Sequence, residues 1–232
     1  MTTSSPAPTH AAFGRFRFST PLPQANPHVL AARFRGAVGT IFTSDTAFHG
    51  HEGDRTVPRY PLVQYRWVNQ APAMFAIGTA AGRAMTFPWP GTSLRIGEHD
   101  VQIAQVDWTS LAMTRAFSRK LVRYEFQAPW IALNQENHAR FRNLDRAARR
   151  QELDRILVGN ILTMSQAFGW FFEPSETVFA AFEPTREVPT TVKNVSLIGF
   201  EGTFVTNLEL PDGLALGRSV SHGYGWFERM SS

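Results

Sequence analysis

The sequence contains no cysteine. A disulfide framework, a zinc site built on cysteine and a thiol nucleophile are therefore excluded, and the composition fits a reducing compartment. No hydrophobic run approaches the roughly 20 residues that a membrane-spanning helix needs, and residues 1–9 lack the apolar segment of a signal peptide. We therefore expect a globular, cytoplasmic protein that has no membrane partner.

Lysine is nearly absent, because 21 of the 23 basic residues are arginine and only Lys120 and Lys193 are lysine. Arginine presents a planar fork that binds phosphate through two hydrogen bonds and stacks on bases, so this bias suits contact with RNA. A GC-rich genome produces the same bias through its codons. The formal net charge of +4 does not decide between the two explanations.

The first half of the chain reads as strands around one helix. Residues 13–19 alternate apolar and polar side chains, as a half-buried strand does. Residues 25–36 predict a helix with Asn26 as its N-cap, Pro27 at its first position and Gly36 near its C-terminal end. Further strands are predicted at 62–68, 74–77 and on both sides of a turn at 97–100, whereas residues 79–90 give no clear signal.

The second half contains the longest helical signal, over residues 134–170, followed by strands at 178–182, 195–206 and 224–228. Asn134 is expected to cap this helix and Trp130 to anchor the core between the two domains. On the N-terminal half of the helix three arginines gather, which form either a solvated face or an RNA-binding patch: Arg146, Arg149 and Arg150.

A glycine-rich segment lies near the end of the chain. Four glycines occur within residues 213–225, interleaved with Arg218, Ser219, Ser221 and His222. Glycine adopts positive φ and permits close approach of another backbone, so such a loop can present N–H groups to a phosphate chain. A plain turn at the end of a strand is the alternative interpretation.

The sequence His49-Gly50-His51 supplies two imidazoles, which in an extended segment would point to the same side. Histidine suits proton transfer because its ordinary pKa lies near neutrality. A surface loop or half of a metal site is the alternative, and the further ligands that the second would need have no recognised spacing: Glu52, Asp54, His99, His138 and His222.

A resemblance covers nearly the whole chain. Residues 207–225 resemble the C-terminal glycine-rich loop of the CRISPR-associated endoribonucleases that cut precursor CRISPR RNA within its repeats, the Cas-six family of the RAMP superfamily. Upstream blocks agree with one branch of this family in order and approximate spacing: Arg35-Gly36, His49–His51 with residues 59–65, and residues 129–135 with 157–162.

The element order in each half suggests two ferredoxin-like units, and the resemblance implies the same α+β fold of tandem ferredoxin-like (RRM-like) domains with a C-terminal glycine-rich loop. We place the first domain at residues 10–125, with the histidine pair, and the second at 126–232, with the RNA-binding loop. The resemblance also implies binding of CRISPR repeat RNA, as precursor and as mature crRNA, together with other Cas proteins of an interference complex.

The resemblance places catalysis on His49 and His51, with no metal and no cofactor. The 2′-hydroxyl of the RNA would attack the adjacent phosphate and leave a 2′,3′-cyclic phosphate and a 5′-hydroxyl. The family often uses a lysine as helper, but residues 1–119 contain none, so charge stabilisation falls to Arg35 and Arg59, with Tyr60 as a donor. RNA binding is assigned to a larger set: Arg55, Arg146, Arg149, Arg150, Arg218, Ser219, Ser221, His222 and Gly223.

Two other functions remain open from the sequence. A catalytically weak relative would hold crRNA as a subunit of an effector complex, although the intact pair of His49 and His51 argues against it. A general single-strand RNA-binding protein of ferredoxin-like fold would show exposed aromatic stacking pairs on a sheet, and no recognisable signature of that kind is present.

Overall fold

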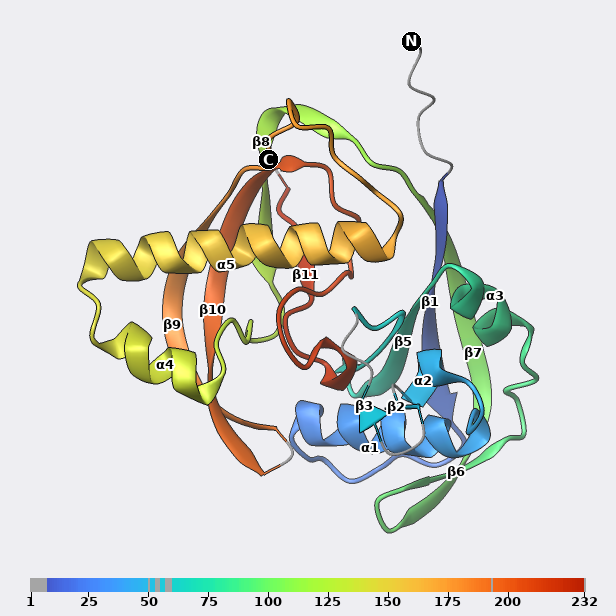
Figure 1. The fold of residues 1–232 in the computed structure, drawn as a ribbon. Helices are drawn as coiled ribbons and strands as arrows, with labels where there is room; N and C mark the ends of the chain where they lie inside the picture. The colour runs from blue at the N-terminus through green and yellow to red at the C-terminus, as the bar shows by residue number, and fades with distance from the viewer. Residues whose placement is uncertain (1–7, 50, 53–54, 57–59, 193, 232) are drawn as a thin grey trace. The chain divides into compact units, whose positions relative to one another are not determined.

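The computed structural model describes residues 8–49, 51–52, 55–56, 60–192 and 194–231, without the side chains of 49, 51–52 and 55–56 (Figure 1). The described residues form two compact units. The first contains residues 8–113 and 221–223, and the second contains 114–220 and 224–231. No helix among the described residues is both long enough and apolar enough to cross a membrane.

The first unit is built on one antiparallel sheet with the strand order β4-β5-β1-β7-β6. Its elements in chain order are β1 (Thr9–Phe18), α1 (Pro27–Ile41), α2 (Thr46–His49), β2 (His51–Glu52), β3 (Arg55–Thr56), β4 (Val63–Val68), β5 (Ala71–Ile77), α3 (Thr79–Thr86), β6 (Ser93–Ile96) and β7 (His99–Met113). β1 lies in the centre and pairs with β5 and β7. The series β1-α1-β4-β5-α3-β7 is the βαββαβ arrangement of a ferredoxin-like fold.

α1 begins where the sequence indicates, because the side chain of Asn26 accepts a hydrogen bond from the backbone N–H of His28 and Pro27 is the first helical residue. The helix ends later than expected, at Ile41, so Gly36 lies inside it. The buried residues Ala37 and Val38 continue the apolar face past this glycine. Burial of that face outweighs the weak helix propensity of one glycine.

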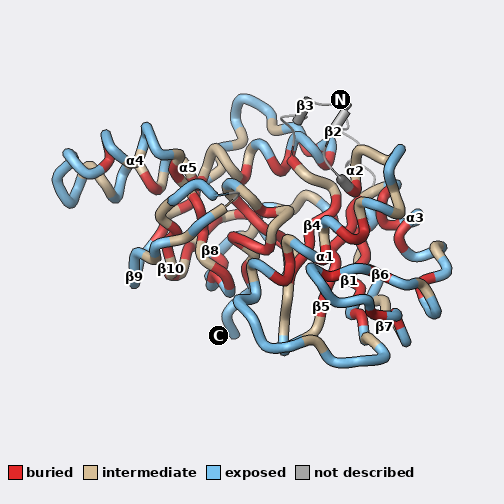
Figure 2. Tube along the Cα trace, turned by 90° about the horizontal axis from the view of Figure 1, so that it is seen from below, coloured by how far each residue is buried: buried red, intermediate tan, exposed pale blue. Residues whose placement is uncertain are grey.

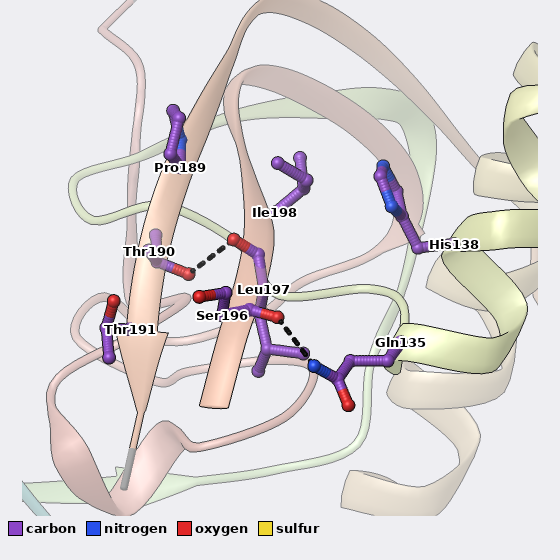
Figure 3. Close-up of a pocket in the computed structure, with 8 residues that line it drawn as sticks. All are labelled: Gln135, His138, Pro189, Thr190, Thr191, Ser196, Leu197 and Ile198. Atoms are coloured by element: carbon purple, nitrogen blue, oxygen red, sulfur yellow. Dashed lines mark hydrogen bonds between the residues drawn. The ribbon is translucent and has the colours of Figure 1, made fainter. Parts of the chain in front are cut away.

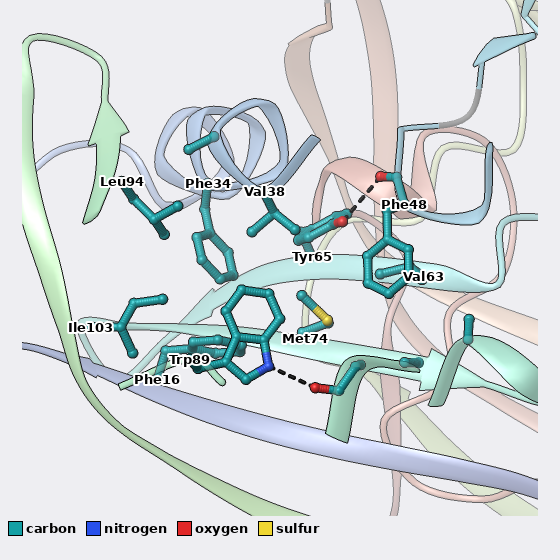
Figure 4. Packing of buried hydrophobic residues seen from close by; sticks show 14 of the residues in the cluster. Phe16, Phe34, Val38, Phe48, Val63, Tyr65, Met74, Trp89, Leu94 and Ile103 are labelled. Atoms are coloured by element: carbon teal, nitrogen blue, oxygen red, sulfur yellow. Dashed lines mark hydrogen bonds between the residues drawn. The ribbon is translucent and has the colours of Figure 1, made fainter. Parts of the chain in front are cut away.

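The core of the first unit is aromatic (Figure 4). Phe34 of α1 packs edge-on against Phe16 and Tyr65, with ring centroids 5.0 and 5.7 Å apart. Trp89 follows α3 and donates from its indole Nε1 to the carbonyl oxygen of Ala84, 2.6 Å away. α3 buries alanines, whose small side chains give little periodic contrast, and this explains why residues 79–90 gave no clear signal from sequence.

The second unit has a four-stranded antiparallel sheet in the order β11-β8-β10-β9. Its elements are β8 (Phe117–Phe126), α4 (Gln135–Arg142), α5 (Arg146–Ala167), β9 (Ala180–Val192), β10 (Val195–Leu208) and β11 (Phe227–Arg229). The strand order matches that of the first unit, with residues 209–226 in the place of a second helix. The sequence-based boundary after residue 125 falls at the end of β8, which pairs with β10 and β11.

The single helix expected over residues 134–170 is two helices. Asn134 caps the short α4, accepting from the N–H of Asn137 at 2.7 Å, and Asp145 caps α5, accepting from the N–H of Ala148 at 2.8 Å. An N-cap residue has a non-helical backbone, so Asp145 marks the break. Figure 2 shows α4 as mostly exposed, in agreement with Phe141 as its one buried residue.

Trp130 lies in the core of the second unit, where it is fully buried. Its ring stacks on Phe126 at 5.6 Å and meets Phe182 edge-on at 5.0 Å. Its indole Nε1 donates to the side-chain oxygen of Asn160 on α5, 3.0 Å away. The expected core position of Trp130 is confirmed, but these partners belong to the second unit itself and not to an interdomain core.

Candidate active site

One face of α1 carries the first functional candidates. Ala31 and Arg35 follow His28 by three and seven residues, so all three lie on one side of the helix. His28 is largely buried, and this burial lowers its pKa, while a hydrogen bond to the backbone of Gly223 acts in the opposite direction. A bond that favours the protonated form is one in which the imidazole N–H donates to a carbonyl oxygen. His28 therefore fastens Gly223 to α1.

Arg35 lies half-buried next to Tyr65 of β4. Burial lowers the pKa of the Arg35 guanidinium, and the interaction with Tyr65 partly offsets this effect. Burial also raises the pKa of the Tyr65 hydroxyl far above its ordinary range, so this group stays neutral. The hydroxyl donates to the carbonyl oxygen of Phe48 at 3.0 Å. Tyr65 thus lies near Arg35 and binds the backbone immediately before His49.

The segment that leads to His49 is firmly held. Phe48 is buried and stacks on Phe42, with ring centroids 3.9 Å apart and planes 8° from parallel. Asp45 accepts from the N–H of Ala47 through its side chain and from the N–H of Phe48 through its carbonyl oxygen. Its carboxylate pairs with Arg83 of α3 at 2.6 Å. The backbone of α2 is therefore held by the buried Phe48 and by the hydrogen bonds of Asp45.

The two histidines occupy different elements. His49 is the last residue of α2, and His51 is the first residue of β2, where it pairs with Thr56 of β3. The expectation of a single extended segment across both residues is therefore not met at His49. The pair therefore lies at the junction of a helix, which ends at His49, and a strand, which begins at His51.

The predicted site residues that follow the histidine pair, Arg55, Arg59 and Tyr60, are described to different extents. Arg55 opens β3, opposite Glu52, and Arg59 lies outside the described residues. Tyr60 is buried, and its hydroxyl accepts a hydrogen bond from the side-chain amide of Gln64 at 2.8 Å. Gln64 is itself fully buried on β4, so it orients the Tyr60 ring from the sheet.

Part of the glycine-rich loop belongs to the first unit. Gly223 has φ of +85°, and a Cβ at this position would lie 3.2 Å from both the Cβ of Ala31 and the carbonyl oxygen of Tyr65. Only glycine combines this backbone conformation with so close an approach. Beside it, the hydroxyl of Ser221 lies 3.2 Å from Nδ1 of His222, and both residues are half-exposed. Ser221 and His222 therefore directly precede the glycine that packs against Ala31 of α1.

The other loop glycines pack within the second unit. A Cβ on Gly217 would lie 2.6 Å from the Trp130 ring, and one on Gly225 would lie 2.1 Å from the carbonyl oxygen of Leu216. The N–H groups of Gly213 and Gly225 donate to carbonyl oxygens of the protein, those of Phe227 and Pro129. These two amides are therefore not available to a phosphate. The loop offers fewer free N–H groups for phosphate binding than the sequence predicted.

Arg218 and Ser219 lie between these packed glycines. The backbone N–H of Arg218 donates to the carbonyl oxygen of Ile131 at 2.9 Å, while its side chain is exposed. Ser219 has φ of +58°, a conformation unusual for a residue with a side chain. The loop therefore holds its backbone against the core and leaves the Arg218 guanidinium in solvent.

The arginines of α5 fall into two kinds. Arg149 donates to the carbonyl oxygens of Leu144 and Arg142 and lies over the Phe141 ring, so it braces the turn between α4 and α5. Arg146 and Arg150 are exposed. The local structure thus gives Arg149 a bracing role that the other two lack.

Two adjoining grooves, each of about 400 Å³, run between α4 and the β9–β10 hairpin. They share His138 and Ile198, and Arg142 and Arg149 line the second. In Figure 3 the side chain of Gln135 reaches the carbonyl oxygen of Ser196, with its Nε2 donating at 3.3 Å. Hydroxyl, amide and cationic groups line this side of the second unit together with the carboxylate of Glu187, which suits contact with a polar chain.

No group of three His, Asp or Glu side chains is arranged as metal ligands in the described part of the chain, from which the side chains at 49, 51–52 and 55–56 are absent.

Family models for the Cas6b N-terminal domain and the Cas6b C-terminal domain match residues 15–111 and 116–230. The chain belongs to the Cas6b family. An uncharacterized protein of Methanocaldococcus jannaschii is 36% identical over 108 residues, which are 47% of this chain and 72% of that protein. The family expected from the sequence is confirmed.

Solved structures agree over almost the whole chain. A crystal structure of Cas6b has a TM-score of 0.81 and 26% identity, and a second, described as the CRISPR RNA processing endoribonuclease Cas6b, has 0.70 and 25%. Both comparisons cover 96% of this chain and 100% of the other. Thermus thermophilus Cas6 shares the fold, with a TM-score of 0.57, 11% identity and coverage of 98% and 100%. The fold of two ferredoxin-like units and the endoribonuclease class expected from the sequence are confirmed.

Sequence reasoning missed His28 and Tyr65. The signal for His28 was its spacing of seven residues from Arg35 on a predicted helix, which places both on one face. Tyr65 carried no signal of its own beyond its place in a strand. Its contact with Phe48, 17 residues earlier, depends on the tertiary fold.

Proposed function

We propose that this chain binds a repeat in precursor CRISPR RNA and cleaves it through attack of the RNA's own 2′-hydroxyl on the adjacent phosphate. The oxygen–phosphorus bond to the 5′-oxygen breaks, which leaves a 2′,3′-cyclic phosphate and a 5′-hydroxyl. The observation that carries this proposal is the junction of α2 and β2, which holds His49 and His51. The residue before this junction, Phe48, is bound through its carbonyl oxygen by Tyr65, which lies near Arg35.

His49 and His51 are assigned the two proton transfers. One imidazole, neutral, takes the proton of the 2′-hydroxyl, and the other, protonated, gives a proton to the departing 5′-oxygen. Histidine can hold both states near neutral pH, so the pair needs no metal ion and no cofactor for this chemistry.

Arg35, Arg55 and Arg59 are assigned to the phosphate, where charge develops in the transition state. Arg35 has the best structural support, because it lies half-buried on α1 near Tyr65, whose hydroxyl binds the backbone that leads to His49. Tyr60, oriented by Gln64, is proposed as a further hydrogen-bonding group. A guanidinium that is held in place needs little reorganisation during the reaction, which is the source of its advantage.

RNA binding is assigned to the loop and to the start of α5. Arg218 and Ser219 are proposed to contact phosphates from the second unit, and Ser221 and His222 from the first, while Gly223 seats the loop on α1. Arg146 and Arg150 supply exposed charge at the start of α5, and Arg149 braces the turn between α4 and α5 and lines one of the grooves. Phosphate contacts of this kind set position and affinity without reading sequence.

The proposed partners are repeat RNA in its precursor and mature forms, and other Cas proteins that receive the product. Precursor RNA is made in the cytoplasm, so we place the protein there. We also propose a division of labour, in which the domain of residues 10–125 carries the chemistry and that of residues 126–232 holds the RNA.

The proposal is tested with His49→Ala and His51→Ala in single-turnover cleavage of repeat RNA. Each substitution is expected to slow cleavage by roughly 10²- to 10⁴-fold, the usual contribution of a general acid or base, with repeat affinity nearly unchanged. His99→Ala is the matched control, because His99 is an exposed histidine of the same unit. Wild-type cleavage rates in both variants would overturn the assignment.

A further inference from the structure

A groove of about 610 Å³ lies in the first unit, apart from the histidine junction. The β1–α1 loop, the first turns of α1 and the β4–β5 turn form its walls. Phe18 and Trp67 line it with their rings 6.2 Å apart, and both are half-buried, so each ring belongs to the core on one side and to the groove on the other. The volume is ample for a planar aromatic group.

The rim of this groove carries amides. Gln24, Asn69 and Gln70 line it and are exposed, and none of their side chains has a hydrogen-bond partner among the described residues. A side-chain amide offers two donors and an acceptor, the pattern that pairs with the edge of a nucleobase. Among the described residues, no acidic side chain lines the groove, and Arg17 at its edge adds positive charge. This lining suits a base on a negatively charged chain.

The groove lies along the same helix as Arg35. Pro27 and Leu30 of α1 line it, and the helix rises about 12 Å from Pro27 to Arg35 at ~1.5 Å per residue. This length equals about three or four stacked nucleotides at ~3.4 Å each. A strand whose cut phosphate lies at Arg35 therefore reaches the groove with a base a few nucleotides away.

We propose that this groove binds the base of one unpaired nucleotide of the repeat, three or four positions from the cut. The base stacks on Trp67, and the amides of Gln24 and Gln70 contact its edge. This inference rests on the proposed function and adds to it a specificity site, which fixes where the cut falls along the strand.

The test pairs Trp67→Ala with repeat RNAs that each lack one base near the cut, with affinity measured by filter binding. In the wild-type protein, one abasic position is expected to weaken binding roughly 5- to 100-fold, the effect of losing one stacked base. Trp67→Ala is expected to weaken binding of the intact repeat to a similar extent and to be insensitive to that abasic position. Such non-additivity identifies a direct contact.

Gln24→Ala guards against a folding defect, because Gln24 is exposed and makes no hydrogen bond within the described protein. It is expected to weaken binding several-fold and to change the base preferred at the same position. Val29→Ala, an exposed change on α1 outside the groove, is the control and should bind like the wild type. Equal sensitivity of wild type and Trp67→Ala at every abasic position would overturn the base site.

Failure of this site and failure of the proposed function give different results. If the wild-type protein binds the repeat but Trp67→Ala and Gln24→Ala bind it equally well, the base site is wrong and the groove serves another ligand, such as a peptide. If the wild-type protein binds no repeat RNA, the proposed function itself is wrong and the base site is rejected with it.

Discussion

The two units share one strand order but differ at one position in the chain. In the first unit, α3 connects β5 to the last part of the sheet and makes ordinary helical hydrogen bonds. In the second unit, residues 209–220 and 224–226 stand at the same place and bond to other parts of the protein instead. Tyr124 holds Leu210 through its hydroxyl, which accepts from the N–H and donates to the carbonyl oxygen.

This difference shows what the loop needs in order to replace a helix. A helix satisfies its backbone groups internally, whereas a loop must find a partner for each buried group. The N–H groups of Gly213, Leu216 and Arg218 donate to Phe227, Gly225 and Ile131 in turn. A loop so held can keep Arg218 exposed at a fixed position, which a helix packed on the sheet would achieve only on its outer face.

The largest expected effect is the loss of stability on Gly225→Ala. A Cβ would lie 2.1 Å from the carbonyl oxygen of Leu216, and the backbone φ of +65° strains any residue with a side chain. We expect the free energy of unfolding to fall by roughly 2–4 kcal/mol, measured by urea denaturation.

Gly82→Ala is the matched control in α3. Nothing lies within 4 Å of a Cβ at Gly82, and the residue is helical and exposed. The same substitution should raise the free energy of unfolding by about 0.5–1 kcal/mol there. Equal effects at the two positions would contradict the distinction between packed loop and free helix.

Arg218→Ala is expected to have the next largest effect, on RNA affinity. Loss of a charge-assisted hydrogen bond to phosphate should weaken repeat binding by about 1–3 kcal/mol, with a smaller effect on cleavage at saturating enzyme. The slope of log affinity against log salt should also decrease by up to ~0.7 per lost contact on single-stranded RNA.

Filter binding at several salt concentrations measures both quantities. Arg119→Ala on β8 is the control, because Arg119 is an exposed arginine of the same unit outside the loop. If affinity and salt slope stay unchanged in Arg218→Ala, the loop is a structural turn and not an RNA contact.

Two tyrosine hydroxyls allow the units to be compared directly. Tyr65→Phe leaves the Phe48 carbonyl without its donor, and Tyr124→Phe releases Leu210. Each should lower the free energy of unfolding by about 1–2 kcal/mol. Tyr65→Phe should slow cleavage with affinity unchanged, and Tyr124→Phe should weaken affinity with the rate at saturation unchanged. Single-turnover kinetics over a range of enzyme concentrations separates the two, and the reverse pattern would refute the division.

The smallest expected effect is the pH dependence contributed by His28. Burial lowers its pKa, so the unfolded chain binds a proton more readily than the folded one. The stability that this group contributes is therefore present above its ordinary pKa of 6.5 and is lost as pH falls through the lowered value. His28→Asn should flatten the fall in unfolding free energy as the pH drops below 6.5, relative to wild type. An unchanged slope would show that His28 is not buried against Gly223.

Local rules predicted the parts of the fold that local interactions decide. Alternation placed β1, and Asn26 with Pro27 placed the start of α1. The end of α1 and the break before Asp145 were missed, because burial of Ala37 and Val38 and the capping of α5 outweighed the simple periodic signal. Most of β9 was missed since residues 183–187 are exposed, lack an apolar alternation and include Pro184.

The candidate site divides in the same way. The histidine pair and Arg35 were visible as residue types in a recognisable order. The contacts of Tyr65 with Phe48 and of Gly223 with Ala31 join residues far apart in sequence, so no local pattern contains them. The loop glycines were expected to face phosphate, whereas Gly217 and Gly225 face protein atoms, because close approach to a core and close approach to a ligand demand the same residue.

The central claim is that the RNA's own 2′-hydroxyl is the nucleophile. Its most direct test is cleavage, in excess EDTA, of a repeat RNA with a single 2′-deoxy substitution before the cut, compared with the all-ribose RNA. The account predicts that the all-ribose RNA is cut and yields a 2′,3′-cyclic phosphate and a 5′-hydroxyl, while the deoxy RNA stays intact. Cleavage of the deoxy RNA, or loss of all cutting with EDTA, would contradict it.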